Sequence, residues 1–449
     1  MGFIISLLGF GGSFILGFFF PRKMGWLVLA TFPLLYAMYA VLLPSTFFPL
    51  TGLRFSFAVT VGILLSNISK DFTLRYLLQS RFVILFIIFV TYTTYLKLNE
   101  PITAIVGTYI PGYFLCIVLP FIIIRNKNDL YKLVKIFVWQ GCIIGFFIVL
   151  EYFTEINPYD YFLPMREWMA SEGNHALNLQ EVLSVRGGFK RVEGLAGNAV
   201  DTGYLLAFYF PLSVWFLSQK KTLYIFPFAF ICAGIILLQT RASFFAIAVA
   251  MVFMIYYLLV ASRKDFKILK FLNIRFVFVL VFLTGFTLIV FPQLKSIVTI
   301  FLVNIFSEEQ GYGIVTKVSR LPIAYGHFIN NPFGYGSPNY AYSILMQTDD
   351  IPAPVVYFLS GGVVLGSLYL LMLWTIQRSV FNILKNFYAD YREKLFLILI
   401  GCGMISAIVV LFSNWREKHL LTAFILYISV YKIYYLIPIV KHNSNSHTT

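Results

Sequence analysis

The sequence predicts an all-α polytopic membrane protein with twelve or thirteen transmembrane helices and two sizeable outer loops. Hydrophobic residues make up 59% of the 449-residue chain and charged residues 12%, and the apolar residues fall in long runs. A soluble domain carries about 25% charged residues and roughly 45–50% apolar ones. The composition therefore excludes a soluble globular enzyme, a disordered chain and a nucleic-acid binder.

Each apolar run is close to the length that crosses a bilayer as a helix, which takes about 20 residues. A helix satisfies its own backbone hydrogen bonds inside lipid, so every run predicts a helix. The runs lie at 3–20, 25–43, 52–67, 82–98, 104–124, 133–152, 200–218, 222–239, 242–261, 275–292, 355–375, 395–412 and 420–439. Leaving out the first run gives twelve helices with both chain ends inside.

Alternate connections between the runs are rich in Lys and Arg, and the positive-inside rule places these connections in the cytoplasm. They hold most of the 34 basic residues. With thirteen helices, this orientation puts the N-terminus outside and the C-terminus inside. The cytoplasmic basic residues are Arg22, Lys23, Lys70, Arg75, Arg81, Arg125, Lys127, Lys132, Lys135, Lys220, Lys221, Arg263, Lys264, Lys267, Lys270, Arg275, Arg378, Lys385, Arg392, Lys394 and Lys441.

The whole chain, 1–449, is expected to form a single integral membrane domain. Two large loops, 153–199 and 293–354, then lie outside, while the basic connection 376–394 and the tail 440–449 lie in the cytoplasm. No soluble segment is large enough for a separate catalytic unit, so any chemistry is expected at the outer surface. All four cysteines lie in apolar runs, which predicts packing without a disulfide or a metal site.

The first polar feature is the turn Gln239-Thr240-Arg241-Ala242-Ser243 between two apolar runs. Both flanking connections are basic, so the turn is placed outside and Arg241 opens the next helix. A cation at a helix N-terminus is unfavourable with the helix dipole. We therefore expect Arg241 and the N-terminal amides of this helix to bind an anion together. The alternative is that Arg241 extends to the lipid headgroups.

The second feature is a basic, glycine-rich loop outside, directly before the run at 200–218. It contains Arg186, Lys190 and Arg191, and glycines at 187, 188, 194 and 197. Backbone amides of such a loop can lie against phosphate oxygens. The alternative is a flexible, solvated loop, because glycine-rich basic stretches are common.

The third feature lies in the second outer loop, from Ser319 to Tyr340. Residues 320–329 predict a short amphipathic helix. The Asn331-Pro332 pair ends this helix, and the glycines at 334 and 336 predict a turn.

Four residues are candidates for a general base. His327 lies on the predicted amphipathic helix, although a lone histidine is more often structural. Asp349 and Asp350 close the second outer loop, and Glu193 lies in the basic loop. The acid pair would act as a base or bind a hydroxyl, the alternative being a solvated corner.

In this order the segments resemble the O-antigen ligase and polymerase superfamily. The resemblance covers about 185–370 by motif and nearly the whole chain by topology. Its motifs are Arg191, Gly194, Gly197 and Asn198, then Thr240-Arg241-Ala242-Ser243, then Arg320 with Asn331-Pro332-Phe333-Gly334-Tyr335-Gly336, and then Gly361-Gly362-Val363-Val364-Leu365-Gly366.

The resemblance implies glycosyl transfer at the outer face of the bacterial cytoplasmic membrane, with no metal and no cofactor. The donor is a glycan on undecaprenyl pyrophosphate, and the implied partners are membrane lipids, a flippase and a chain-length regulator. Ligases of the superfamily carry a His-Asn-like pair shortly before the glycine pair, where this sequence has Ile351-Pro352-Ala353-Pro354. The difference favours a polymerase over a ligase that transfers the glycan to lipid A-core.

Arginines give planar, bidentate contacts to phosphate oxygens, and such stabilisation of a leaving group is often the largest catalytic effect. We therefore expect Arg191, Arg241 and Arg320 to clamp the pyrophosphate, with Arg186 and Lys190 nearby. Tyr325, Tyr335 and Tyr340 are candidates for stacking on sugar rings, the alternative being anchoring at the headgroups.

The alternative from another class is a flippase or other transporter of lipid-linked oligosaccharides. Transporters carry charged or broken helices near the middle of the membrane. Here the central thirds of the runs are nearly uncharged and the candidate cations lie at outer ends, which favours surface chemistry over transport.

Overall fold

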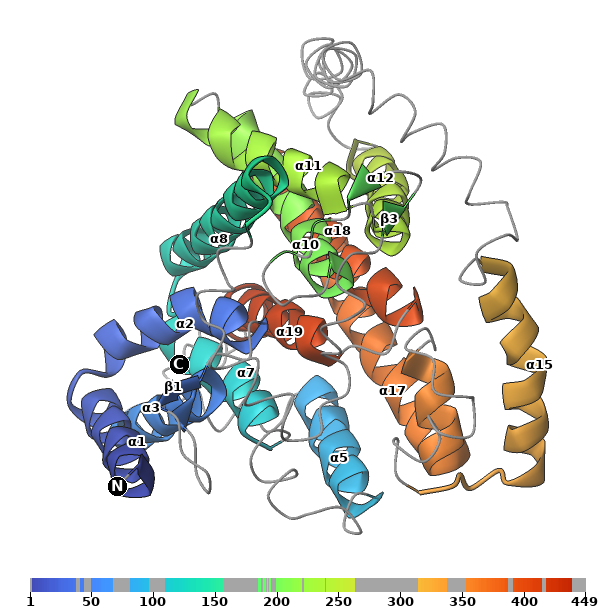
Figure 1. Cartoon of the computed structure of the whole chain (residues 1–449), viewed down its shortest axis with the longest axis horizontal. Coiled ribbons are helices and arrows are strands. Elements are labelled where there is room, and N and C mark those ends of the chain that lie inside the picture. Colours follow the sequence, from blue (N-terminus) through green and yellow to red (C-terminus); the bar gives the residue numbers. More distant parts are fainter. Residues whose placement is uncertain are drawn as a thin grey trace, which may run out of the picture.

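In a computed structural model of the chain, the regular elements of the described residues are helices and two short antiparallel strand pairs (Figure 1). It describes residues 2–37, 41–43, 50–67, 81–96, 110–156, 185–186, 189–190, 192, 194, 199–219, 222–238, 240–262, 314–336, 353–386, 391–413 and 417–437. The helices are α1 (Gly2–Phe19), α2 (Pro21–Ala37), α3 (Gly52–Asn67), α5 (Arg81–Leu96), α7 (Ile110–Ile123), α8 (Lys127–Thr154), α10 (Ala199–Ser218), η5 (Thr222–Tyr224), α11 (Ile225–Leu238), α12 (Arg241–Ser262), α15 (Ile314–Asn330), α17 (Ala353–Asn386), α18 (Tyr391–Ser413), α19 (Glu417–Tyr431) and the π-helix η7 (Lys432–Leu436). The strands are β1 (Val41–Leu43), β2 (Leu50–Thr51), β3 (Val185–Arg186) and β4 (Phe189–Lys190).

Twelve of the thirteen predicted apolar runs form helices, and the run at 275–292 lies outside the described residues. Several boundaries differ from the prediction. The run at 25–43 is helical only to Ala37, because Val41–Leu43 forms strand β1 and pairs with β2. α8 begins at Lys127, six residues before the run, because Asn126 caps it there. α17 continues to Asn386, so the first part of the predicted connection 376–394 is helical.

Four of the described helices are long and apolar enough to cross a membrane. They are Lys127–Thr154, Ala199–Ser218, Ala353–Leu384 and Arg392–Val410. Seven further apolar helices in the described part are shorter. The fold class is therefore that of an all-α membrane protein, as predicted, while the number of spans and their orientation remain predictions.

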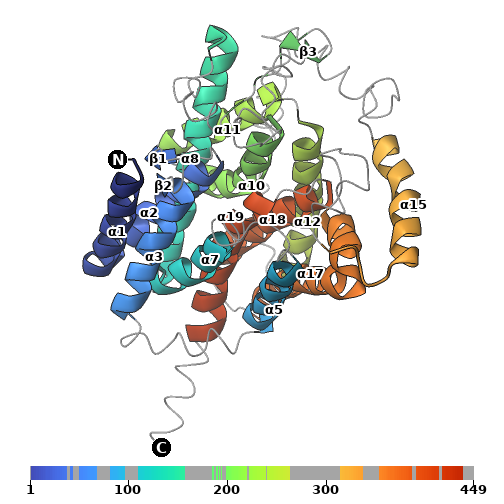
Figure 2. The same ribbon diagram turned by 60° about the horizontal axis from the view of Figure 1, so that its bottom comes forward.

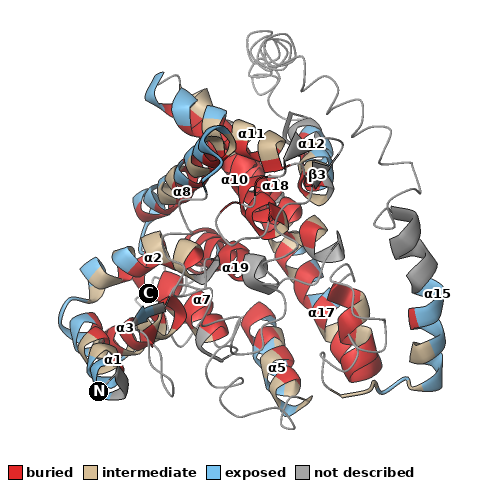
Figure 3. Ribbon diagram, viewed as in Figure 1, coloured by how far each residue is buried: buried red, intermediate tan, exposed pale blue. Residues whose placement is uncertain are grey.

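Helix α10 lies at the centre of the molecule and packs against α8, α11, α12, α18 and α19 (Figures 1 and 2). It is buried along nearly its whole length, as are the middle parts of α18 and α19 (Figure 3). The buried residues of α10, α18 and α19 are almost uniformly apolar and aromatic, so none of these three helices presents a polar face there. Since the outer helices cover this centre, the large core is one continuous cluster.

Glycines bring α8 and α11 into close backbone contact. Gly141 and Gly145 lie one helical turn apart on α8, and a Cβ on Gly145 would overlap the Phe230 carbonyl of α11. A Cβ on Gly234 of α11 would in turn lie 3.1 Å from the Gly145 Cα. Small residues at this spacing let helix backbones approach in membranes, where packing replaces the hydrophobic effect.

The helix ends predicted on the cytoplasmic side meet one another. Lys127 Nζ at the start of α8 lies 2.6 Å from Glu393 Oε1 at the start of α18, and the Tyr434 hydroxyl of η7 donates to the same oxygen at 2.8 Å. Arg22 at the start of α2 reaches Asp129 of α8 at 3.5 Å. Four chain segments thus converge at one end of the bundle.

Lys432 has a structural explanation at this same end. It lies in the last predicted run and is 3% exposed. Its ammonium donates to the Phe121 carbonyl, near the C-terminus of α7, and lies 4.7 Å from the Phe121 ring centroid. A cation suits a helix C-terminus because the last carbonyls carry partial negative charge. The buried lysine therefore caps α7.

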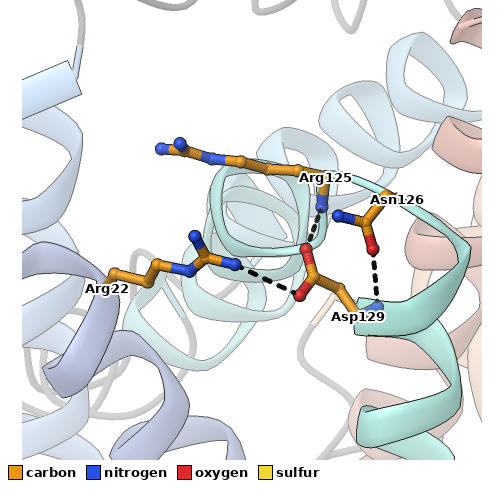
Figure 4. Close-up of polar contacts among 4 residues, drawn as sticks. All are labelled: Arg22, Arg125, Asn126 and Asp129. Atoms are coloured by element: carbon orange, nitrogen blue, oxygen red, sulfur yellow. Dashed lines mark hydrogen bonds and ion pairs between the residues drawn. The ribbon is translucent and has the colours of Figure 1, made fainter.

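The start of α8 carries a reciprocal cap (Figure 4). The Asp129 amide donates to Asn126 Oδ1 at 2.9 Å, and the Arg125 amide donates to Asp129 Oδ2 at 3.0 Å. The two side chains thus satisfy backbone groups that the first helical turn leaves unpaired, in the manner of a capping box. Asp129 also places a negative charge where the helix dipole favours one.

Candidate functional site

The structure describes the predicted site residues to different extents. Arg191, Glu193, Tyr340, Asp349 and Asp350 lie outside the described residues. For four of the predicted cations the structure describes the backbone and not the side chain, namely Arg186, Lys190, Arg241 and Arg320. Tyr325, His327 and Tyr335 are described in full.

The basic, glycine-rich loop contains the antiparallel pair β3 and β4. Val185 pairs with Lys190 and Arg186 pairs with Phe189. Gly187 and Gly188 stand between the strands, and Gly-Gly is a dipeptide that suits a two-residue hairpin turn. The backbones of two predicted phosphate-binding residues are therefore held in one hairpin.

The end of this loop is fixed on α8 by a carboxylate. Gly194 donates its amide to Glu151 Oε2 at 3.1 Å, and Glu151 is 8% exposed. Gly194 has φ +71°, a left-handed conformation that favours glycine. A Cβ there would lie 2.8 Å from Thr202 Oγ1 of α10, so the loop packs closely on that helix as well.

The Thr240–Ser243 turn packs against the next residue of α10. Thr240 Oγ1 donates to Ser243 Oγ at 2.6 Å, and both residues are buried. A Cβ on Gly203 would lie 2.5 Å from Ser243 Oγ and would overlap Thr240 Oγ1. The Gly194 loop and the turn that begins α12 therefore contact successive residues at the start of α10.

We call the buried polar residues at this junction the junction cluster. They come from α8, from the start of α10, from the residue before α12 and from the first turn of α12, and each is at most 8% exposed; they are Glu151, Asp201, Thr202, Thr240 and Ser243. Glu151 was not among the predicted site residues. Its signal in the sequence is the single acid of the run at 133–152, near the outer end of that run.

A second junction joins residues 331–336 to a break in α17. Gly361 and Gly362 have non-helical backbone angles, so α17 consists of two helices. The amide of Tyr335 donates to the Leu359 carbonyl and that of Gly336 to the Ser360 carbonyl, both at 2.8 Å. The Val363 amide returns a bond to the Pro332 carbonyl at 2.9 Å. The segment thus satisfies backbone groups that the break removes from the helix.

Glycine is required on both sides of this second junction. Gly334 and Gly362 have φ of +88° and +63°. A Cβ on Gly334 would overlap the Ser360 carbonyl, and a Cβ on Gly362 would overlap the Pro332 carbonyl. The predicted turn is present but lies earlier than expected, because the Gly334 amide closes it by donating to the Asn331 carbonyl at 3.0 Å. The chain is already helical from Ala353, so the glycine pair at 361–362 lies within α17. Its non-helical backbone angles bend the helix there.

The two parts of α17 fold back on each other at the bend. The Tyr357 and Tyr369 rings lie 4.5 Å apart between centroids, although twelve residues in a straight helix span about 18 Å. A Cβ on Gly366 would overlap the Phe358 ring. Residues 363–386 are long enough to cover about 36 Å, more than a bilayer core of about 30 Å. The break therefore lies near one end of a segment that is long enough to span a bilayer, rather than at its middle.

Helix α15 rests on the first part of α17 and carries His327. The predicted amphipathic helix is confirmed, although it begins at Ile314, six residues earlier than expected. Ala324 is buried with Val356 and Leu359. The half-buried His327 lies 6.0 Å from the Tyr335 ring between centroids, and the Tyr335 hydroxyl donates to the His327 carbonyl at 3.1 Å.

A neighbouring face of α15 is apolar and exposed. Leu321, Tyr325 and Ile329 recur at intervals of four residues and are 44%, 64% and 56% exposed. Tyr325 therefore belongs to an apolar stripe, which supports headgroup anchoring for this tyrosine. Figure 3 shows α15 as the most exposed of the helices at this edge of the molecule.

These contacts join predicted motifs in pairs. The Gly194 loop and the Thr240–Ser243 turn meet at the start of α10, and residues 331–336 meet the glycine pair of α17. Among the described residues, no three His, Cys, Asp or Glu side chains are grouped closely enough to hold a metal ion. Comparison of the chain with protein-family models, with curated proteins and with solved structures found no match.

Proposed function

We propose that the protein is a polysaccharide polymerase of the bacterial cytoplasmic membrane. It transfers a growing glycan from undecaprenyl pyrophosphate to the end of another lipid-linked repeat unit at the outer face. The observation that carries this proposal is the packing of the four motifs of the resemblance into two joined pairs. In the first pair, Gly194 and Gly203 pack against Thr and Ser side chains at the start of α10, and in the second pair backbone hydrogen bonds join the two segments. The first set of contacts positions the Gly194 loop and the Thr240 turn, which adjoin the candidate arginines Arg191 and Arg241 in the sequence.

The transfer has two chemical requirements. The acceptor hydroxyl oxygen forms a bond to the anomeric carbon of the donor, and the bond from that carbon to the pyrophosphate oxygen breaks. The hydroxyl proton passes to a base, for which His327, Asp349, Asp350 and Glu193 are the candidates. The departing pyrophosphate gains negative charge, which Arg191, Arg241 and Arg320 would stabilise, assisted by Arg186 and Lys190.

The position of His327 supports its candidacy. Its ring contacts Tyr335, whose backbone amide is bonded across to α17. The histidine is therefore held near a fixed backbone segment while remaining half-buried, which leaves part of it accessible. Tyr335 lies beside it and is the described candidate for contact with a sugar ring.

The break in α17 also bears on the transporter alternative. Transporters place discontinuous helices near the bilayer midplane, where the substrate binds. The break at Gly361 and Gly362 lies near the end of a segment that is long enough to span by itself. This position favours a site at the membrane surface, which is where a polymerase would act on lipid-linked substrates.

Arginine-to-lysine variants test the pyrophosphate clamp. Arg241→Lys and Arg320→Lys keep the charge but lose the bidentate fork, so each is expected to reduce polymer formation by about 100-fold. The measurement is the ladder of surface glycan in a deletion strain that carries each variant at equal membrane abundance. Arg378→Lys, an exposed arginine on the long part of α17, is the matched control and should restore the ladder. Wild-type ladders from both site variants would rule out the clamp.

A further inference from the structure

The starts of α2 and α8 lie together and present a concentration of exposed cations. Arg22 and Lys23 on α2 are exposed, as are Arg125 and Lys132 at the start of α8. The contact between Arg22 and Asp129 joins the two helices at this point. We call these four side chains the basic junction.

The basic junction has more positive charge than its carboxylate can neutralise. Asp129 accepts from the Arg22 guanidinium with Oδ1 and from the Arg125 backbone amide with Oδ2, so its two oxygens are engaged. Within the described part of the chain, no carboxylate forms an ion pair with Lys23, Arg125 or Lys132. In Figure 4 both guanidinium groups extend toward the same side of the Asp129 carboxylate.

Aromatic and apolar side chains place this junction at the level of lipid headgroups. Lys132 Nζ lies 4.2 Å from the centroid of the Trp26 ring, a cation–π contact. Tryptophan is enriched where the bilayer core meets the headgroups. Leu27, the next residue of α2, is 45% exposed and offers apolar surface beside the cations.

We propose that the basic junction binds the phosphodiester headgroup of an anionic phospholipid. The arginines supply forked donors that match phosphate oxygens, and the lysines add charge. The lipid tails would run along the exposed face of α2 that contains Leu27. Basic pockets between helices at one membrane face are known to bind anionic headgroups. The proposal is independent of the polymerase activity, because no residue of the basic junction belongs to the candidate site.

The test measures lipid binding to the full-length protein in detergent by native mass spectrometry. The probes are phosphatidylglycerol, which is anionic, and phosphatidylcholine, which is zwitterionic. Wild-type protein is expected to bind phosphatidylglycerol at least about 25-fold more tightly. Each basic side chain near an anionic membrane surface contributes about 1 kcal/mol, or about fivefold in affinity. The double variant with Lys23→Gln and Arg125→Gln should therefore lose about 25-fold for phosphatidylglycerol and should bind phosphatidylcholine unchanged.

Controls separate a site from the general charge of this membrane face. Arg378→Gln removes an exposed arginine from α17 and should leave phosphatidylglycerol affinity within twofold of wild type. An equal loss in this control, or no loss in the double variant, would overturn the proposal. So would full displacement of the lipid by an excess of inorganic phosphate, because the junction would then be a site for a free anion. If the double variant unfolds, the two single variants, each with an expected fivefold loss, replace it.

Discussion

Replacing Gly334 by alanine is expected to abolish the function and to destabilise the protein by about 3–5 kcal/mol. The residue has φ +88°, and its Cβ would lie 2.5 Å from the Gly362 amide nitrogen and overlap the Ser360 carbonyl. These neighbours are backbone atoms, which cannot turn aside as a flexible side chain can. Segment 331–336 would have to leave α17, and three inter-segment hydrogen bonds would be lost with it.

Two other glycines provide a graded control for Gly334. Gly336 has φ +95° but open space around its Cβ position, so Gly336→Ala should cost about 1–2 kcal/mol from backbone strain alone. Gly326 lies in α15 with open space, and Gly326→Ala should be neutral or stabilising by up to about 1 kcal/mol. Thermal unfolding in detergent and the glycan ladder measure all three variants. Equal behaviour of Gly334→Ala and Gly336→Ala would contradict the second junction.

Replacing Glu151 is expected to separate a positioning role from a catalytic one. Glu151→Ala removes a buried acceptor of the Gly194 amide and should cost about 3 kcal/mol, lowering the unfolding midpoint by on the order of 5 °C. Polymer formation should fall with it, since the loop that carries Arg191 loses its attachment to α8. Glu151→Gln keeps a side-chain oxygen acceptor and should retain most of the activity.

The control for Glu151 is the exposed acid four residues later. Glu155 follows the last turn of α8, and Glu155→Gln should change the stability by less than about 0.5 kcal/mol. A Glu151→Gln variant that folds normally but makes as little polymer as Glu151→Ala would contradict the positioning role. It would instead make Glu151 the general base, because only the carboxylate accepts a proton there.

The sequence predicted the helical elements well because composition and hydrophobic runs determine them. The run at 200–218 became α10, and the predicted turn before Arg241 separates α11 from α12. Boundaries were less accurate where a cap or a polar helix extended an element. Asn126 and Asp129 start α8 before its apolar part, and α15 continues N-terminal to Arg320.

The contacts at the site were only partly predictable. The glycines at 334 and 336 indicated a turn and those at 361 and 362 belonged to a motif of the resemblance, but nothing local specified that the two pairs would share hydrogen bonds across the chain. Glu151 and Gly194 are separated by 43 positions, and their contact follows from how α8 and α10 pack. Such long-range pairings are decided by tertiary packing and not by spacing, so single-sequence reasoning identified the motifs and not their partners.

Deleting the gene and separating the surface glycan on a gel tests the proposed polymerase activity most directly. The proposal predicts loss of the ladder, with a single repeat unit still attached to its carrier lipid. Full-length polymer accumulating on undecaprenyl pyrophosphate would contradict the polymerase and indicate a ligase. An unchanged ladder would contradict both activities.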